Sequence, residues 1–562
     1  MISSSCWVPR GFAAEFPEKY ELDDAEMDRI TKMAQLELED AKEDLQEAEK
    51  AQNALTLQDQ ATVDDDLKEY NLENYDNDGQ ETAGESVGFF PGLSATDAQY
   101  EENDEGDAYL SLPTNADLQE DKKEMQIYPT DNLVLATRTE DDVLYLDVYV
   151  YDDGAGAPSG SKEEQADRLD QDVANGMTRE ANLYVHHDLM LPSFPLCVEW
   201  VNFRPNAAES TENIGNFAAV GTFEPQIEIW NLDCIDKAFP DVILGEPQQN
   251  SFTGLSSKKK KKKSKGKEHV TTHHTDAVLS LAHNKIHRNV LASTSADTTV
   301  KLWDLVSGTA VKSFSKIHEG KIVSSSQWHP LEASILLTGG YNGACAVSDV
   351  RVSDENQMSK SYYVGSGQEV ENVRWGAEPE IFYCGTDNGN VYCFDVRVQD
   401  KPLWTLHAHD SGISSLDINR NVPGMLITSA MNEKAVKLWK CPTGKGGPSM
   451  VLSRDFGVGN VLTTAFAGDF EVAGNLTIGG VTGALKMWDC FSNRSVRATF
   501  KQELSSLQKA ARERAVAAGI ASRIARKYQG DGSETLMTVE AGKIDADSDS
   551  DEEPAGMDED ED

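Results

Sequence analysis

The segment LASTSADTTVKLWD (291–304) holds two short apolar runs separated by a polar turn, and its second run ends in Trp303-Asp304. Short apolar runs bounded by turn residues are typical of β-strands. The pattern recurs in LLTGGYNGACAVSD (336–349), FYCGTDNGNVYCFD (382–395), ITSAMNEKAVKLWK (427–440) and TIGGVTGALKMWD (477–489). It recurs more loosely upstream, in LATRTEDDVLYLDVYVYD (135–152) and FAAVGTFEPQIEIWN (217–231). The sequence therefore contains seven copies of one strand–turn–strand unit.

The spacing of these units indicates a repeat architecture. The units end at Tyr151, Trp230, Trp303, Ser348, Phe394, Trp439 and Trp488, and the last four intervals are 45, 46, 45 and 49 residues. Repeats of about 40–45 residues ending in Trp-Asp are typical of WD repeats, each of which forms one four-stranded blade of a β-propeller. One blade cannot bury its apolar faces alone, whereas a ring of blades can. We predict an all-β fold, a seven-bladed WD-repeat β-propeller over residues 125–500, with loop insertions at 153–181 and 246–268.

The first strand of each blade should be apolar, because it lines the crowded centre of the ring. The candidates are LCVEWVNF (196–203), VLSLA (278–282), VSSSQWHP (323–330), VENVRW (370–375), ISSLDI (413–418) and VLTTAF (461–466). Blade one has no such strand before Leu133. ISSSCWVPRG (2–11) aligns with SSSQWHP, with Trp7 against Trp328, so we predict residues 1–11 as the inner strand of blade one. VRATF (496–500) is predicted as the fourth strand of blade seven.

The third unit carries the buried hydrogen-bond chain typical of WD repeats, and we predict it as a structural relay. Its residues are His274, Ser293, Asp297 and Trp303. Such a chain lets the indole N–H, the hydroxyl and the imidazole satisfy one another inside a blade. The fourth and fifth units depart from it, with Asn342 and Asn388 at the Asp position and Ser348 and Phe394 at the Trp position.

The net charge of −45 is concentrated in segments outside the repeats. Residues 21–120 hold 30 acidic against 5 basic residues, and residues 541–562 hold 11 against 1. We predict residues 12–124 as an acidic insertion, helical over 21–55 on its apolar spacing and irregular elsewhere, and 531–562 as a disordered acidic tail. Residues 501–530 read as a basic, alanine-rich helix, which either lies on the propeller or contacts RNA. Acidic segments favour basic partners such as histones.

Two further segments indicate localisation and regulation. A lysine block comprises Lys258, Lys259, Lys260, Lys261, Lys262, Lys263, Lys265 and Lys267. Such a block is a nuclear-import or phosphate-contact patch, with a solvated loop as the alternative. Ser548 and Ser550 have acidic flanks suited to an acid-directed kinase.

No pattern of catalytic, metal-binding or cofactor-binding residues is present. The eight cysteines form no CxxC pair and are predicted to be reduced thiols of an intracellular protein. His269 and His273 are four residues apart but lie at a strand entry, so we predict no metal site. We also predict no cofactor, no small-molecule substrate and no membrane segment.

Several segments outside the generic repeat resemble the periodic tryptophan protein 1 family of eukaryotic WD-repeat proteins. They are CWVPRG (6–11), LKEYNLENYD (67–76), IYPTDNLVLATRTEDD (127–142), VYVYD (148–152) and LYVHHDLMLPSFPLCVEW (183–200). The resemblance implies a protein of the nucleus and nucleolus that acts in pre-rRNA processing and large-subunit assembly. Its implied partners are pre-ribosomal assembly factors and pre-rRNA.

Two other functions remain open from the sequence. The acidic segments fit a chromatin or histone-binding module. SDVR (348–351) and FDVR (394–397) resemble the WDxR pattern of substrate adaptors of cullin-type ubiquitin ligases, although the Trp is absent from both. Arg351 and Arg397 are the residues on which that reading depends.

Overall fold

The computed structural model describes residues 1–20, 99–102, 108–111, 125–141, 143–154, 181–207, 213–245, 269–398, 401–442, 446–518, 522, 524–525, 527–528 and 535–539. The chain divides into two compact units, one of Met1–Lys19 with Met125–Asp562 and one of Tyr20–Glu124. In the second unit the described residues form an antiparallel hairpin of β3 (Gln99–Glu102) and β4 (Ala108–Ser111), in a region predicted to be irregular. The helix predicted over 21–55 lies outside the described residues.

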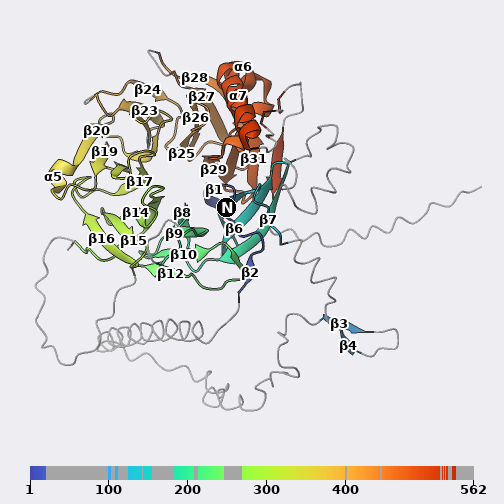
Figure 1. Cartoon of the computed structure of the whole chain (residues 1–562). Helices are drawn as coiled ribbons and strands as arrows, with labels where there is room; N and C mark the ends of the chain where they lie inside the picture. The colour runs from blue at the N-terminus through green and yellow to red at the C-terminus, as the bar shows by residue number, and fades with distance from the viewer. Residues whose placement is uncertain are drawn as a thin grey trace, which may run out of the picture. The chain divides into compact units, whose positions relative to one another are not determined.

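The first unit contains seven four-stranded antiparallel sheets, which follow one another round a ring in chain order (Figure 1). The predicted seven-bladed propeller is confirmed. The innermost strands are β1 (Ile2–Val8), β8 (Pro195–Val201), β13 (Val278–His283), β17 (Val323–Trp328), β21 (Val370–Trp375), β25 (Ile413–Ile418) and β29 (Val461–Phe466). The second strands are β5 (Asn132–Glu140), β9 (Phe217–Thr222), β14 (Val290–Ser295), β18 (Ile335–Gly340), β22 (Ile381–Thr386), β26 (Met425–Ala430) and β30 (Asn475–Gly480).

The third and fourth strands complete each blade. The third strands are β6 (Val143–Asp152), β10 (Ile227–Asn231), β15 (Val300–Asp304), β19 (Ala344–Asp349), β23 (Asn390–Asp395), β27 (Ala435–Lys440) and β31 (Leu485–Asp489). The outermost strands are β7 (Asn182–Met190), β12 (Val242–Leu244), β16 (Thr309–Phe314), β20 (Ser359–Tyr363), β24 (Trp404–His407), β28 (Ser449–Asp455) and β32 (Leu536–Val539). A short helix, α5 (Glu355–Met358), precedes β20.

Strand β1 is the inner strand of blade one and lies between β8 and β29 (Figure 1). It pairs with β5, with Val8 opposite Leu133. Ile2 is fully buried in a cluster that joins blade one to Leu485 and Met487 of blade seven. The inner strand predicted within residues 1–11 is therefore β1, and it closes the ring by non-covalent packing.

The inner strands are less apolar than predicted, because hydroxyl side chains join them across blades. Neighbouring inner strands converge without a shared backbone ladder, and their side chains supply the hydrogen bonds instead. The pairs are Ser5 with Thr463 (3.1 Å), Ser280 with Ser326 (3.2 Å) and Ser415 with Thr464 (2.9 Å). The centre of the ring is held by polar contacts as well as by apolar packing.

A tryptophan near the end of the inner strand repeats one contact at three blade junctions. Each indole N–H donates to a backbone carbonyl of the preceding blade's inner strand. The pairs are Trp7 with Ala465 (3.1 Å), Trp328 with Ala282 (2.9 Å) and Trp375 with Gln327 (3.3 Å). Trp200 differs, because its indole donates to Asn216 of its own blade at 3.0 Å.

Blade seven corrects three predicted boundaries. Residues 496–500 are not a strand: they fall in and just after α6 (Arg494–Thr499), whose first turn is capped by the Asn493 side chain. Val496 and Phe500 are both fully buried, four residues apart, which is helical spacing. The fourth strand is β32, so the propeller extends beyond residue 500. Because β32 lies within residues 531–562, the disordered tail predicted over that range begins too early in the sequence.

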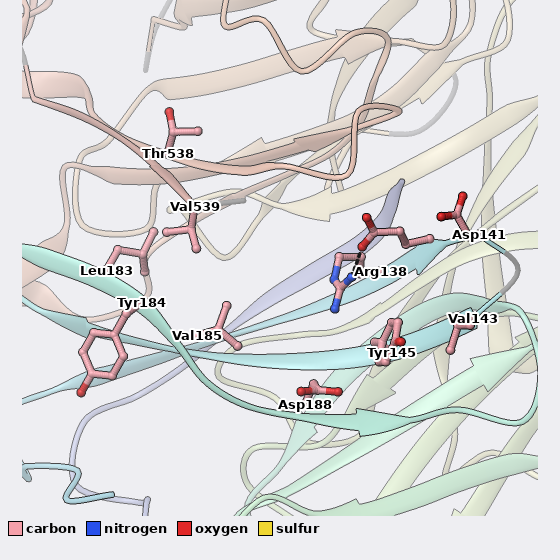
Figure 2. A pocket seen from close by; sticks show the side chains of 11 residues that line it. Arg138, Asp141, Val143, Tyr145, Leu183, Tyr184, Val185, Asp188, Thr538 and Val539 are labelled. Atoms are coloured by element: carbon pink, nitrogen blue, oxygen red, sulfur yellow. Dashed lines mark hydrogen bonds and ion pairs between the residues drawn. The ribbon is translucent and has the colours of Figure 1, made fainter. Parts of the chain in front are cut away.

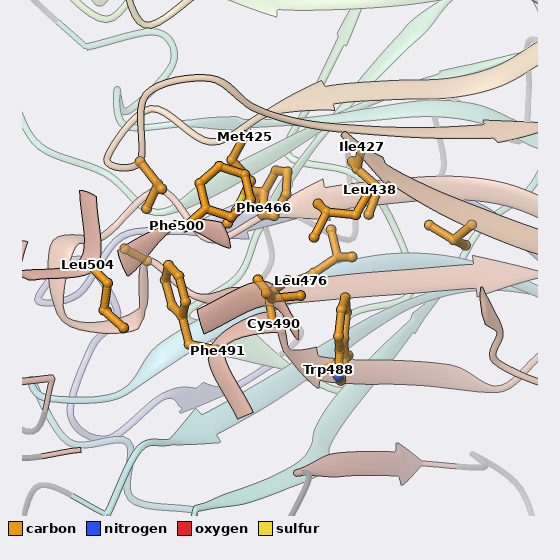
Figure 3. Packing of buried hydrophobic residues seen from close by; sticks show 14 of the residues in the cluster. Met425, Ile427, Leu438, Phe466, Leu476, Trp488, Cys490, Phe491, Phe500 and Leu504 are labelled. Carbon is orange, nitrogen blue, oxygen red and sulfur yellow. The ribbon is translucent and has the colours of Figure 1, made fainter. Parts of the chain in front are cut away.

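The basic helix predicted over 501–530 is also too long. Helix α7 covers Lys501–Ala518, and Gly519, a residue that favours helix ends, follows it in the sequence. Leu504, Leu507 and Ala511 bury one face of α7 in a cluster with Phe491 and Phe500. Figure 3 shows Leu504 near Phe491 and Phe500 in this cluster. Of the two readings offered for this segment, the structure shows the helix lying on the propeller. Short 3-10 turns, η3 (Phe470–Val472) and η4 (Cys490–Ser492), flank the same cluster.

The chain leaves and re-enters the first unit at one place. Strand β2 (Glu18–Lys19) pairs with β11 (Cys234–Ile235) beside blade two, and the Ile127 N–H donates to the Glu15 carbonyl at 3.0 Å. The segments on either side of residues 21–124 are therefore tied to the propeller and to each other.

Replacing residues 21–124 with a flexible linker of about ten residues is expected to leave the melting temperature within about 2 °C of the full chain's, because no propeller strand is lost and a short linker closes the gap at small entropic cost. Differential scanning calorimetry measures this. The same linker in place of residues 246–268 is a matched control. A fall of more than 5 °C for the first variant alone would show that the acidic insertion supports the ring.

Candidate interaction surfaces

The four predicted relay residues of blade three are brought together. His274 Nδ1 lies 2.9 Å from the Asp297 carboxylate and Nε2 lies 2.7 Å from the Ser293 hydroxyl. Trp303 donates its indole N–H to Ser293 at 2.8 Å. Burial lowers the pKa of His274, which favours the neutral imidazole. Because the Asp297 carboxylate can only accept, the tautomer that fits this contact carries its proton on Nδ1. Although burial alone would raise it, the pKa of Asp297 is held below its ordinary value by hydrogen bonds from His274 and Thr299.

Blade six contains a second complete relay that the sequence analysis missed. His409 contacts Glu433 at 2.7 Å and Thr428 at 2.8 Å, and Trp439 donates to Thr428 at 2.9 Å. Compared with the relay of blade three, Thr428 replaces the serine and Glu433 replaces the aspartate. The signal was available, because His409 precedes its inner strand by four residues, as His274 does. A search for the chemistry of the residues rather than for their identity would have found it.

Blades four and five keep only parts of the relay. In blade four, His318 contacts Asn342 at 3.0 Å and Thr338 at 2.8 Å, while Ser348 bonds Ser359 instead of an indole. In blade five, the side-chain Oε1 of Gln368 accepts hydrogen bonds from the Thr386 hydroxyl and from the Tyr392 hydroxyl, both at 3.1 Å. These contacts join strands within each blade, and Asn388, at the Asp position of blade five, is exposed.

The buried His318 side chain is expected to make the stability of the fold depend on pH. Burial lowers the pKa of His318 to about 4, and Asn342 offers no compensating charge. The folded state thus binds fewer protons than the unfolded state between pH 6.5 and 4, and stability falls as the pH falls through that window. We expect His318 to account for roughly 2–3 kcal/mol of lost unfolding free energy by pH 4. His318→Gln replaces the titratable imidazole with a neutral amide and should lose correspondingly less. Urea unfolding at pH 7, 5.5 and 4.5 measures the free energy of unfolding of both proteins. An equal fall of that free energy with pH in wild type and His318→Gln would contradict the prediction.

A groove opens where blade one meets blade seven, and we call it the blade-one groove. Its volume is about 870 Å³. Figure 2 shows Tyr145 and Asp188 on the strands of blade one and Thr538 and Val539 on the facing strand of blade seven. The complete lining is Arg138, Glu140, Asp141, Val143, Tyr145, Leu183, Tyr184, Val185, Asp188, Thr538 and Val539.

The groove contains one guanidinium and several carboxylates. Arg138 donates to the buried Asp147 through Nε (2.7 Å) and Nη2 (3.2 Å), also contacts Glu140, and lies 4.3 Å over the ring of Tyr145. Burial raises the pKa of Asp147, Arg138 opposes that shift, and Asp188, directly opposite in the strand register, raises it further. The groove therefore has an excess of negative charge.

The helical insertion of blade seven forms another exposed surface. Asp489, the acidic residue of the last Trp-Asp pair, accepts from the Tyr528 hydroxyl at 2.8 Å and pairs with Lys527. Arg514 lies 4.0 Å over the ring of Phe470. Lys501, Lys509, Arg512 and Arg514 of α7 are exposed, against one exposed acidic residue of the helix, Glu513. The insertion is thus anchored at Asp489 and presents a basic face.

The remaining predicted sites divide into described and undescribed ones. Arg351 and Arg397 are exposed, and each is paired with the aspartate two residues earlier, at 2.8 and 2.7 Å. The lysine block (258–263, 265 and 267), Ser548 and Ser550 lie outside the described residues. All eight cysteines are unpaired. Within the described ranges, no group of three His, Cys, Asp or Glu residues is arranged to hold a metal, and no helix there is long and apolar enough to cross a membrane.

Comparison with known proteins gives matches over one repeat and over the whole chain. A family model described as "WD domain, G-beta repeat" matches residues 266–304. Periodic tryptophan protein 1 of Saccharomyces cerevisiae is 58% identical over 561 residues, which cover 96% of this chain and 97% of that protein. A WD repeat-containing protein of Schizosaccharomyces pombe is 38% identical, covering 90% and 92%. The periodic tryptophan protein 1 homolog of Drosophila melanogaster is 31% identical, covering 78% and 83%.

Proposed function

This chain belongs to the periodic tryptophan protein 1 family of WD-repeat proteins, and from that we propose that it is a nucleolar scaffold for pre-ribosome assembly. WD-repeat propellers are typically non-catalytic scaffolds. The observation that carries the proposal is the length of the likeness, which covers 96% of this chain. It includes the segments outside the repeats as well as the blades. Supporting pre-rRNA processing and large-subunit biogenesis is the role implied for that family.

The described surfaces are compatible with a scaffold that binds several partners. The blade-one groove is acidic, whereas the exposed side of α7 is basic, and both lie on a ring held by buried relays. We propose that pre-ribosomal assembly factors and pre-rRNA bind such surfaces. A rigid ring with separate, differently charged faces brings partners together without changing its own shape.

Co-sedimentation tests the assembly role. An epitope-tagged chain is expected to migrate with large-subunit precursors in a sucrose gradient, and its depletion is expected to cause unprocessed pre-rRNA to accumulate. An unrelated tagged propeller of similar mass is the matched control. Recovery of the protein only in the light fractions, with normal pre-rRNA, would exclude the proposal.

Nuclear and nucleolar localisation is a separate proposal, supported by the run of lysines at 258–263. A fluorescent fusion of the chain should concentrate in the nucleolus, and changing Lys258–Lys263 to Gln should leave more of it in the cytoplasm. Changing six lysines elsewhere in the sequence controls for net charge. An unchanged distribution for the lysine-block variant would count against import through that block.

Histones or other basic proteins are a second class of candidate partner, favoured by the 30 acidic residues among residues 21–120. A histone pull-down that resists salt and requires residues 21–120 would support this function. The linker variant that lacks residues 21–124 is the appropriate comparison, since its propeller strands are all retained.

A further inference from the structure

The blade-one groove exists because neighbouring blades differ in strand length. Strands β5, β6 and β7 of blade one have 9, 10 and 9 residues, whereas β31 and β32 of blade seven have 5 and 4. The last pair of blade seven is Leu485 with Val539. In a propeller each blade face is covered by its neighbour. The longer strands of blade one therefore extend beyond β31 and β32, and the residues that the structure describes leave part of their face uncovered.

The uncovered face carries apolar side chains and a fixed aromatic ring. Val143 is 37% exposed and Met190 is 59% exposed. Tyr145 lies directly opposite Met190 in the strand register, so both side chains are on the same face of the sheet. The Arg138 guanidinium stacked on Tyr145 holds the ring in place. The floor of the groove is thus ordered before any partner binds, which lowers the entropic cost of binding.

Arg138 carries the one guanidinium in the lining of the groove, and it is already hydrogen-bonded to carboxylates of this chain. Arg138 bonds both oxygens of Asp147 and also contacts Glu140. Among the residues that the structure describes, Asp141 and Asp188 form no ion pair. Asp188 also faces Asp147 directly across the strand pair, where like charges are unfavourable. A cation entering the groove would relieve this repulsion.

We propose that the blade-one groove binds an extended segment of a partner protein in which Lys or Arg alternates with aliphatic residues. The basic side chains pair with Asp188 and Asp141, and the aliphatic ones cover Val143 in the groove and Met190, which lies outside the lining but opposite Tyr145 on the same face. β7 and β32 are both outermost strands of their sheets, so an extended segment also has backbone edges to bond.

The negative charge of the groove favours a basic segment over two other possible occupants, the chain's own residues 540–562 and RNA. The chain's own residues 540–562 follow Val539, but they hold twelve acidic residues and one lysine, so the groove repels them. The phosphate backbone of RNA is repelled for the same reason. The proposal goes beyond the assembly function, because it holds for any complex in which such a segment is presented.

Fluorescence anisotropy with the full chain tests the proposal. The probe is a fluorescein-labelled peptide of alternating Lys/Arg and Val, and its matched control peptide has Glu at every basic position. The double variant Asp141→Asn/Asp188→Asn is expected to bind the basic peptide at least tenfold more weakly than wild type. Asp410→Asn, which removes a carboxylate that is 99% exposed in blade six, is expected to bind as wild type does.

A stability measurement separates binding from folding. Because Asp188 repels Asp147, the double variant should melt no lower than wild type while losing peptide affinity. Photo-crosslinking of the peptide should label residues 138–145, 183–190 or 536–539. Equal affinity for the double variant and Asp410→Asn would overturn the proposal, as would labelling confined to residues 21–124. Truncation after Val539 is expected to leave affinity unchanged, and a tenfold gain would identify the tail as the occupant instead.

Discussion

Removal of residues 1–8 is expected to abolish the soluble, cooperatively folding propeller. The deletion leaves β5 without its inner partner and exposes one side of β8 and of β29. It also removes Ile2, which packs between blade one and blade seven, and Val8, both fully buried. The loss of Ile2 and Val8, at about 2–5 kcal/mol each, and of the β1–β5 hydrogen bonds is comparable to the 5–15 kcal/mol by which a native protein is usually stable. Solubility on expression and the thermal transition of any soluble fraction measure the effect.

A conservative change at the same strand provides the control. Trp7→Phe keeps an aromatic ring but removes the hydrogen bond from the indole to the Ala465 carbonyl. It should cost only about 1 kcal/mol and leave a folded ring. A deletion variant that melts at the wild-type temperature would show that β1 does not close the ring.

His274→Ala is expected to lower the free energy of unfolding by about 3 kcal/mol at pH 7. The substitution removes both hydrogen bonds of the imidazole and leaves the buried Asp297 carboxylate and Ser293 hydroxyl short of a partner. Asp297, whose pKa is held low in the folded state by this contact, would then resist burial as an anion. Chemical denaturation monitored by tryptophan fluorescence measures the change.

His269→Ala is the matched control for that experiment. His269 is exposed, and its single contact described is to the Ser313 hydroxyl at 2.9 Å. Its loss should change stability by less than about 0.5 kcal/mol. Similar costs for the two variants would mean that the relay contributes nothing beyond the volume of a histidine.

The strand–turn–strand units could be located from the sequence because they depend on local pattern. Each predicted unit end, such as Trp303 and Phe394, falls in the third strand of a blade. The strand at residues 2–8 could be located because Trp7 and Trp328 occupy the same place in aligned segments. Both indoles donate to the preceding inner strand, so the resemblance reflects a shared contact.

Blade seven could not be completed from the sequence, because its fourth strand is separated from its third by a helical insertion. VRATF has the β-branched and aromatic residues of a strand, yet Asn493 caps a helix and Phe500 packs with Leu504. The strand that pairs with β31 is the short segment LMTV, which adjoins acidic sequence on one side. Local composition favoured the wrong segment, and only tertiary packing selects the right one.

The blade-one groove, like the fourth strand of blade seven, could not be predicted from sequence patterns. It arises from the difference in length between strands of two blades that are far apart in the chain. Arg138, Asp147 and Asp188 read individually as ordinary polar positions of β-strands. Their proximity depends on the strand register, which no spacing rule for a single repeat specifies.

The contact between Trp7 and Ala465 spans 458 residues, and this has a consequence for the newly made chain. At about 5–20 residues per second of synthesis, Trp7 emerges roughly 20–90 s before its acceptor exists. During that interval β1 has one open side, and the completed blades form an arc with two exposed apolar ends. Such an intermediate is prone to pair with other nascent chains. The yield of folded protein should therefore depend on how fast ribosomes translate the message and on whether a holdase binds the amino-terminal strand until synthesis reaches blade seven.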